Sequence, residues 1–297
     1  MISPRMSLPL FTLKKCLTYF RNYMKKILVP TDFSQYAEYA LKTAAQIARR
    51  NKGEIILLHM LELPNQMVDA VTGGSDIPEV MFFMQRARER FDEVKKSPFL
   101  EGIPVTEAVQ FERAFDGIIQ SSKKHSVDLI VMGSHGASGF QEFFVGSNTE
   151  KVVRSSDVPV LVVKNELDIT KIKRFVFASD FAGEIRKPFT QVIDFAKAFG
   201  AHLDLLVINT PSFFRSTEES EKAINEFLSG FDIQDYSMHI FNDYSVEKGV
   251  LNFARRVSAD LIGVSTHGRT GVNRFLNGSI GEDIVNHAKR PVVTFKI

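Results

Sequence analysis

The sequence predicts an α/β protein of two tandem, doubly wound domains, each with a five-stranded parallel sheet, and two observations carry this prediction. First, the chain repeats itself: KILVPTDF at 26–33 recurs as RFVFASDF at 174–181, and DLIVMGSHG at 128–136 recurs as DLIGVSTHG at 260–268. Second, short apolar runs alternate with amphipathic stretches, which favours parallel strands joined by right-handed helical crossovers. A repeat of about 140 residues indicates duplicated domains rather than a solenoid.

In the first copy, apolar or alternating runs predict strands at 27–30, 55–60, 103–111, 128–132 and 159–163. Apolar residues at helical spacing predict helices at 36–50, 80–94, 115–124 and 147–154. The second copy follows the same order from 175–178 to 292–295, and it is 16 residues shorter between its second and fourth strands. We therefore expect domains at 24–164 and 171–297, joined by a linker at 165–170.

Composition bounds the class of protein. The length of 297 residues suits two domains, and 44% hydrophobic with 24% charged residues is ordinary globular usage. The apolar runs are far shorter than the roughly 20 residues of a membrane helix. A net charge of +2 gives no broad nucleic-acid footprint. With one cysteine, Cys16, no internal disulfide forms. We expect a cytoplasmic protein with neither a membrane nor a nucleic-acid partner.

Residues 1–23 mix basic and apolar side chains, and we set them apart from the fold. Lys14 and Lys15 interrupt the apolar stretch, and no small-residue cleavage site follows it. Met24 stands directly before the first clean strand. We expect a disordered leader or a start assigned too far upstream, with a transit peptide or membrane-surface helix as the alternative. A chain that begins at Met24 should keep the same melting temperature.

The residues that carry chemistry follow two strands of the first copy. Asp32 comes directly after the first strand, Gly133 and Gly136 follow the fourth, and Gly146-Ser147 opens the next helix. Ligands of such sheets bind beyond the carboxyl ends of the strands. Glycines let the backbone approach an anion closely, and the free N–H groups of a helix start favour phosphate. Asp32 could accept a hydrogen bond from a ribose hydroxyl or hold a divalent ion. The pattern is neither a Walker A loop nor a Rossmann fingerprint.

These motifs resemble the universal stress protein family. Its nucleotide-binding members carry G-x-x-G, nine residues, and then Gly followed by Ser or Thr, which Gly133, Gly136, Gly146 and Ser147 match. Its first strand ends in Pro-Thr-Asp, as at 30–32, and SDVPVLVV at 156–163 is also typical. The resemblance covers both copies, roughly 24–297.

The resemblance implies a fold of the Rossmann-like, adenine-nucleotide α-hydrolase type and binding of ATP or another adenine nucleotide, with Mg²⁺ as an optional companion. It implies little hydrolysis and a role in stress survival as a sensor or adaptor for a protein partner that the sequence does not identify. The last strands, 159–163 and 291–296, should pair, so that the chain is an internal pseudo-dimer; a homodimer of whole chains also stays open.

The candidate nucleotide-binding residues of the first copy are Pro30, Thr31, Asp32, Met132, Gly133, His135, Gly136, Gly146, Ser147, Asn148 and Thr149. Those of the second copy are Asp180, Ser265, His267, Gly268, Gly278 and Ser279. Ser265 stands where the first glycine belongs, so a positive φ there would be strained or its side chain would crowd the nucleotide, and the second site should bind more weakly. Arg269 and Arg274 could contact phosphates instead, or be solvated loop residues.

We expect no catalytic residues and no metal site formed by the protein alone. The seven histidines include no pair at helical spacing and have no cysteine partner, which argues against structural zinc. Ser134 and His135 are adjacent, and adjacent side chains seldom face each other; no G-x-S-x-G elbow is present. Asp32-Phe33-Ser34 also replaces the His-x-Gly-His turn of adenylyl-transfer enzymes. The alternatives are a slow ATPase or nucleotide-transfer enzyme, and an interaction module without ligand whose glycine loops are only turns.

Overall fold

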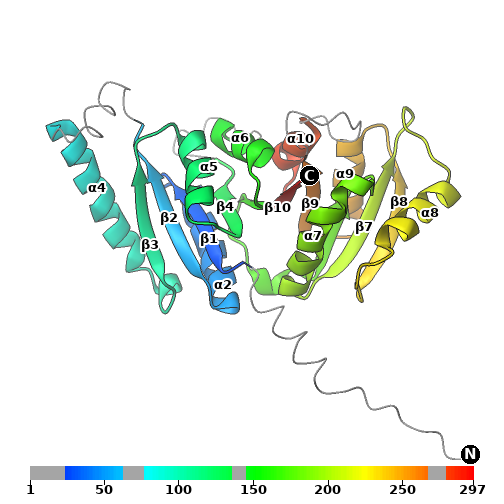
Figure 1. The fold of residues 1–297 in the computed structure, drawn as a ribbon, viewed down its shortest axis with the longest axis horizontal. Helices are drawn as coiled ribbons and strands as arrows, with labels where there is room; N and C mark the ends of the chain where they lie inside the picture. The colour runs from blue at the N-terminus through cyan, green and yellow to red at the C-terminus, as the bar shows by residue number, and fades with distance from the viewer. Residues whose placement is uncertain (1–23, 63–76, 136–144, 267–278) are drawn as a thin grey trace, which may run out of the picture.

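A computed structural model describes residues 24–62, 77–135, 145–266 and 279–297, so the leader at 1–23 lies outside the described residues. Its strands form one ten-stranded sheet in the order β3-β2-β1-β4-β5-β10-β9-β6-β7-β8 (Figure 1). The strands are β1 (Lys26–Thr31), β2 (Glu54–Met60), β3 (Val105–Gln110), β4 (Leu129–Gly133), β5 (Val160–Val163), β6 (Arg174–Ala178), β7 (His202–Asn209), β8 (Tyr236–Asn242), β9 (Leu261–Thr266) and β10 (Val292–Lys296).

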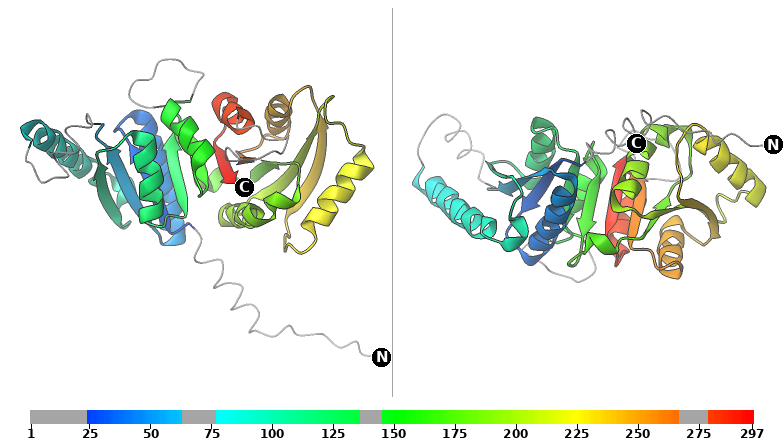
Figure 2. Two further views of the ribbon diagram at one scale, coloured as in Figure 1. Left: turned by 45° about the horizontal axis from the view of Figure 1, so that its top comes forward. Right: turned by 90° about the horizontal axis from the view of Figure 1, so that it is seen from below.

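Helices cover both faces of this sheet, as the views in Figure 2 show. The described helices are α2 (Gln35–Asn51), α4 (Pro78–Lys95), α5 (Ala114–Lys124), α6 (Ser147–Ser155), α7 (Arg186–Phe199), α8 (Thr217–Leu228), α9 (Val246–Arg256) and α10 (Ser279–His287), with short 3₁₀ turns η1 (Pro98–Leu100), η2 (Ile169–Lys171) and η3 (Gly183–Ile185). One buried cluster joins α2, α4, α7 and α8 to the sheet, and a second joins α5, α6, α9 and α10 to the opposite face. The predicted α/β fold is therefore confirmed.

The two halves meet at the antiparallel pair of β5 and β10. Val292 lies opposite Val162 and Thr294 opposite Val160, whereas the strands within each half are parallel. This pairing confirms the expected internal pseudo-dimer through the last strands, and it covers two apolar edges that would otherwise be open. Because β10 runs against β5, the carboxyl ends of β1–β5 and of β6–β10 lie at opposite edges of the sheet.

The second half differs from the first in how its first helix begins. Whereas α2 starts three residues after Asp32, α7 starts only at Arg186, after the 3₁₀ turn η3. Phenylalanine side chains fill this side of the sheet. The ring of Phe177 lies 5.8–6.3 Å from those of Phe181, Phe189 and Phe295. The spacing of the sequence motif predicts none of this rearrangement.

Polar contacts also join the halves, at the ends of α6 and α10. Lys296 donates to the carbonyl oxygen of Ser155 (3.2 Å) and pairs with Asp157 (2.7 Å). In the related position, Lys164 donates to the carbonyl oxygen of Asn286 (2.6 Å). The residue that corresponds to Asp157 by the 132-residue repeat is a lysine, Lys289, so the sequence supplies no carboxylate at that place for Lys164.

Burial lowers the pKa of Lys164 to about 8, which makes a testable prediction for stability. Between this value and the ordinary pKa of 10.5, the unfolded chain binds more protons than the folded one, so stability should rise with pH across that window. The cost of the buried charge is fully present below about pH 8. We expect Lys164→Met to flatten this rise, measured by urea unfolding from pH 7 to 10. An identical slope in the variant and the parent would contradict the assignment.

Candidate functional site

A cavity of about 300 Å³ lies at the carboxyl edge of the first half, between the ends of β1, β2 and β4 and the first turns of α5 and α6. It brings together Pro30, Thr31, Asp32, Met132, Gly133, His135, Gly146, Ser147, Asn148 and Thr149. These are all the site residues that the sequence predicts in the first copy except Gly136, which lies outside the described residues. The cavity opens to solvent, so a ligand can enter it.

A tight turn after β1 holds Asp32 at the cavity. The Thr31 hydroxyl accepts from the N–H of Phe33 (3.0 Å), and the Asp32 carboxylate accepts from the N–H of Ser34 (3.0 Å). Ser34 then caps α2 by accepting from the N–H of Ala37. Phe33 takes φ of 62°, an unusual value for a residue other than glycine. The second half repeats the turn, with φ of 52° at Phe181 and Asp180 accepting from the N–H of Ala182.

The start of α6 is the part of the cavity best suited to an anion. Its N-cap is Gly146, which makes no side-chain capping bond, so the N–H groups of the first turn have no capping side chain. Two bonds fix this segment: the N–H of Gly146 donates to the Ser134 carbonyl (2.7 Å), and the Thr149 hydroxyl donates to the Gly133 carbonyl (3.1 Å). An uncapped helix start beside a cavity can receive a phosphate.

Gly133 is required by packing and not by a positive φ, which excludes one of the two reasons considered for a glycine at this place. Among the described glycines, only Gly102, Gly200 and Gly230 have positive φ. A Cβ on Gly133 would instead lie 2.7 Å from the backbone of Tyr36 in α2. Ser265 also has no positive φ, so backbone strain there is wrong as an explanation.

The Ser265 side chain points to the face of the sheet that α7 and α8 cover, not to the face that α9 and α10 cover. Side chains alternate along a strand, so Ser265 shares the face of Leu261, which packs with α7 and α8. Its hydroxyl is buried and has no hydrogen-bond partner among the residues that the structure describes. Because α7 begins later than α2, the second half accommodates a Cβ where the first half does not.

His135 sits at the cavity with one unsatisfied nitrogen. Its Nδ1 lies 2.9 Å from the Ser134 hydroxyl, so these adjacent side chains do touch, contrary to the sequence-based expectation. Its Nε2 is buried and has no hydrogen-bond partner among the described residues. The ring packs 5.0 Å from that of Tyr36. A buried nitrogen without a partner is costly, and a ligand atom in the cavity could satisfy it.

Besides Ala37 in the first turn of α2, five residues that sequence reasoning missed line the cavity: His59, Met60, Glu62, Ala114 and Ile118. The Nδ1 of His59 contacts the Thr31 carbonyl oxygen (2.8 Å), and Glu62 accepts from the N–H of Ala114 (3.1 Å). They belong to the end of β2 and the start of α5 and carry no motif. Knowing that β2 pairs with β1 would have predicted the residues at the end of β2, because both strands end at the same edge of the sheet.

Only some of the site residues predicted in the second half lie among the residues that the structure describes. Asp180 lies in the turn after β6, and Ser265 lies in β9. Ser279 is the first residue of α10. His267, Gly268 and Gly278, together with Arg269 and Arg274, lie outside the described residues. Weaker binding in the second half therefore stays a prediction.

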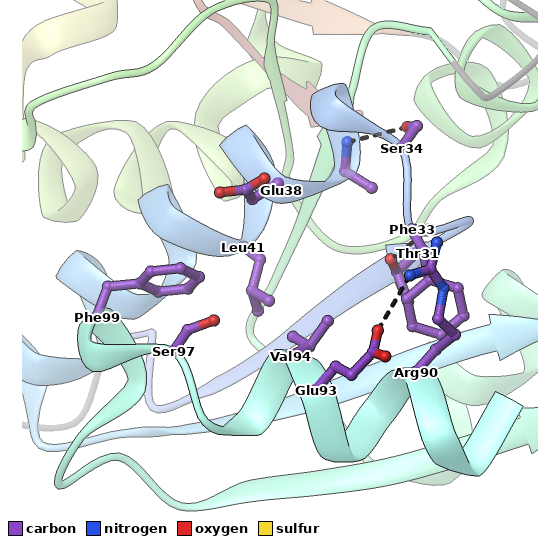
Figure 3. A pocket seen from close by; sticks show the side chains of 11 residues that line it. Thr31, Phe33, Ser34, Glu38, Leu41, Arg90, Glu93, Val94, Ser97 and Phe99 are labelled. Atoms are coloured by element: carbon purple, nitrogen blue, oxygen red, sulfur yellow. Dashed lines mark hydrogen bonds and ion pairs between the residues drawn. The ribbon is translucent and has the colours of Figure 1, made fainter.

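A smaller cavity, of about 240 Å³, lies between α2 and α4 (Figure 3). It shares Thr31 with the first cavity, and its rim carries the pair of Arg90 and Glu93 (3.0 Å). The Arg90 guanidinium also lies 5.9 Å from the centre of the Phe33 ring. The smaller cavity also shares Ala37, so it adjoins the candidate site, but apart from Thr31 none of the predicted site residues that the structure describes lines it.

Two further observations on the described residues bear on other classes of function. Among them, no cluster of three or more His, Cys, Asp or Glu side chains could hold a metal ion, and the expected lack of a metal site formed by the protein alone stays a prediction. Within the same residues, no helix has the length and apolar character needed to cross a membrane.

The fold and the cavity define a tandem α/β protein whose first half has an uncapped helix start beside a cavity. The family model described as the universal stress protein family matches residues 24–164 and 237–296, and the chain belongs to this family. A universal stress protein of Methanocaldococcus jannaschii is 32% identical over 155 residues, which cover 48% of this chain and 96% of the relative. One from Synechocystis is 22% identical over 300 residues, covering 92% and 100%.

Solved structures agree on the fold of the whole chain. The crystal structure of a universal stress protein from Archaeoglobus fulgidus matches with a TM-score of 0.69 at 23% identity, covering 92% of this chain and 97% of that one. At this identity the likeness supports the fold alone. Because it covers 92% of this chain, it reaches into 165–236, the stretch that the family model does not match and in which α7 begins late.

Proposed function

We propose that the protein binds an adenine nucleotide, ATP first of all, in the cavity of its first half, and that it acts as a nucleotide-dependent sensor or adaptor in stress survival. The observation that carries this proposal is the uncapped start of α6, which lines the same cavity as Asp32. The proposal also places the protein in the cytoplasm, with a protein partner still to be found.

The cavity offers separate surfaces for the parts of a nucleotide. Met60, Ile118 and Met132 give apolar surface for a base. Asp32 can accept hydrogen bonds from ribose hydroxyls, and the first turn of α6 can donate N–H groups to phosphates. A magnesium ion, if it accompanies the nucleotide, would be held by the phosphates with Asp32 or Glu62 as the nearest carboxylates.

The charge of the lining supports binding without rapid turnover. No lysine or arginine lines the described part of the cavity, and the sequence from 133 to 149 contains none. Phosphoryl transfer is accelerated by cations aimed at the charge that develops on the transferred group. Without such side chains, we propose that occupancy of the site, rather than hydrolysis, carries the signal.

Calorimetric titration of the full chain with ATP tests the proposal, together with mass spectrometry of small molecules released from the natively purified protein. We expect saturable binding, competition by AMP and weaker competition by GTP. Absence of both heat and released nucleotide at millimolar ATP would overturn the proposal in favour of an interaction module without ligand. Turnover of labelled ATP beyond one equivalent would instead favour the slow ATPase.

A further inference from the structure

We propose that Asn286, in the last turn of α10, is a positioning residue for the nucleotide cavity of the first half, so that the second half completes the site of the first. This inference rests on the proposed function, because it concerns how the same cavity is held. It assigns a role to a residue that belongs to none of the sequence motifs.

The contacts of Asn286 cross between the two halves. Its side-chain Oδ1 accepts from the backbone N–H of Val145 (3.0 Å), and its Nδ2 donates to the carboxylate of Glu150 (2.9 Å). These partners fix the orientation of the amide, since an N–H can only donate and a carboxylate accepts. Asn286 is 8% exposed and Val145 is 4% exposed, so water does not readily replace either bond.

This contact matters for the site because of where Val145 lies in the chain. Val145 directly precedes Gly146, the N-cap of α6. The N–H of Gly146 is held by Ser134 of its own half, whereas the N–H of Val145 is held by Asn286 of the other half. Loss of that acceptor leaves a buried donor unsatisfied, which the chain can relieve only by moving. Such a movement displaces the N–H groups of α6 that the proposed function aims at phosphate.

The residue that corresponds to Asn286 by the pseudo-symmetry of the molecule cannot make the same contact to a backbone N–H. Positions 132 residues apart correspond in the two halves, so Glu150 corresponds to Glu282 and Asn286 corresponds to Arg154. Arg154 pairs with Glu282 (3.4 Å), which repeats the contact to the carboxylate. A guanidinium has no acceptor, however, so Arg154 cannot hold a backbone N–H as Asn286 does. At this position, therefore, a side chain of the second half holds a backbone N–H of the first half, whereas Arg154 of the first half cannot do the same for the second.

The test compares ATP affinity, measured by calorimetry on full chains, with thermal stability. We expect Asn286→Ala to bind ATP about tenfold more weakly, the effect of losing one to two buried hydrogen bonds. Asn286→Asp should also weaken binding, because it sets a second carboxylate against Glu150. Adding Glu150→Gln to that variant should restore affinity to within about threefold, since the aspartate still accepts from Val145 and the glutamine now donates.

Lys296→Met is the matched control. It loosens the same interface, but at the other end of α6, where Lys296 contacts Ser155 and Asp157. We expect a lower melting temperature with unchanged ATP affinity. Equal ATP affinity in Asn286→Ala and the parent would overturn the inference while the proposed function stands. Equal losses of affinity in Asn286→Ala and Lys296→Met would also overturn it, as a general effect of the interface.

Two further outcomes are decisive. If Asn286→Ala does not fold, the comparison of Asn286→Asp with its Glu150→Gln double variant decides, and a failure to restore affinity overturns the inference. If the parent protein itself binds no nucleotide, the proposed function fails, and the role assigned to Asn286 fails with it.

Discussion

Replacing Gly146 by valine should weaken ATP binding by about a hundredfold or more. Gly146 is the N-cap of α6 and lines the cavity, so the added isopropyl group occupies the space that a phosphate needs. Hydrogen bonds to charged groups contribute about 1.5–3 kcal/mol each, and 1.4 kcal/mol is a factor of ten in affinity. Keeping a phosphate from two N–H groups therefore accounts for a loss of this size.

The fold should survive this substitution. Gly146 has φ of −61° and ψ of 144°, a conformation open to any residue. Gly183→Val is the control, because a Cβ on Gly183 meets nothing within 4 Å and its φ is ordinary. The ATP affinity from calorimetry, together with a melting curve for each variant, tests this prediction. If the ATP affinity of Gly146→Val lies within threefold of the parent, the start of α6 is not part of the binding site.

The fold was predictable because its signals are local and occur twice. The apolar run at 27–30 and the alternation at 103–111 predict the strands seen as β1 and β3. The late start of α7 was not predictable, since Phe181 and its neighbours repeat the motif of the first copy. That change depends on how the phenylalanine side chains pack beneath the helix, which periodicity does not encode.

The residues of the candidate site were likewise predictable only in part. Residues of the strand-end and glycine motifs, such as Asp32 and Ser147, were predictable because parallel strands bring their carboxyl ends to one edge. His59 and Glu62 were not, because their place depends on which strand lies beside β1. Asn286 was the least predictable of all. Its contact with Val145 requires the antiparallel packing of two helices from different halves.

Replacing Gly133 by serine, the residue that the second half carries at the same place, should have the largest effect on stability. A Cβ on Gly133 would lie 2.7 Å from the carbonyl carbon and oxygen of Tyr36, too close for any real contact. Backbone atoms cannot swing away as a side chain does, so α2 must move from β4. Overpacking of this kind costs typically 1–3 kcal/mol and occasionally more. A loss of 1 kcal/mol lowers the melting temperature of a domain of this size by roughly 2–4 °C.

The reverse substitution, Ser265→Gly, distinguishes the two explanations for the glycine, close packing and a positive φ. If the glycine served a positive φ, Ser265→Gly would relieve strain and stabilise the second half clearly. Because Ser265 has no positive φ, we expect a change within about 1 kcal/mol, with the loss of a buried unpartnered hydroxyl offsetting the added flexibility of glycine. Gly133→Ser should also weaken ATP binding, since Tyr36 follows the turn that holds Asp32. Melting of Gly133→Ser within 1 °C of the parent would show that α2 can move at no cost, and that the close approach of α2 to β4 does not explain the glycine.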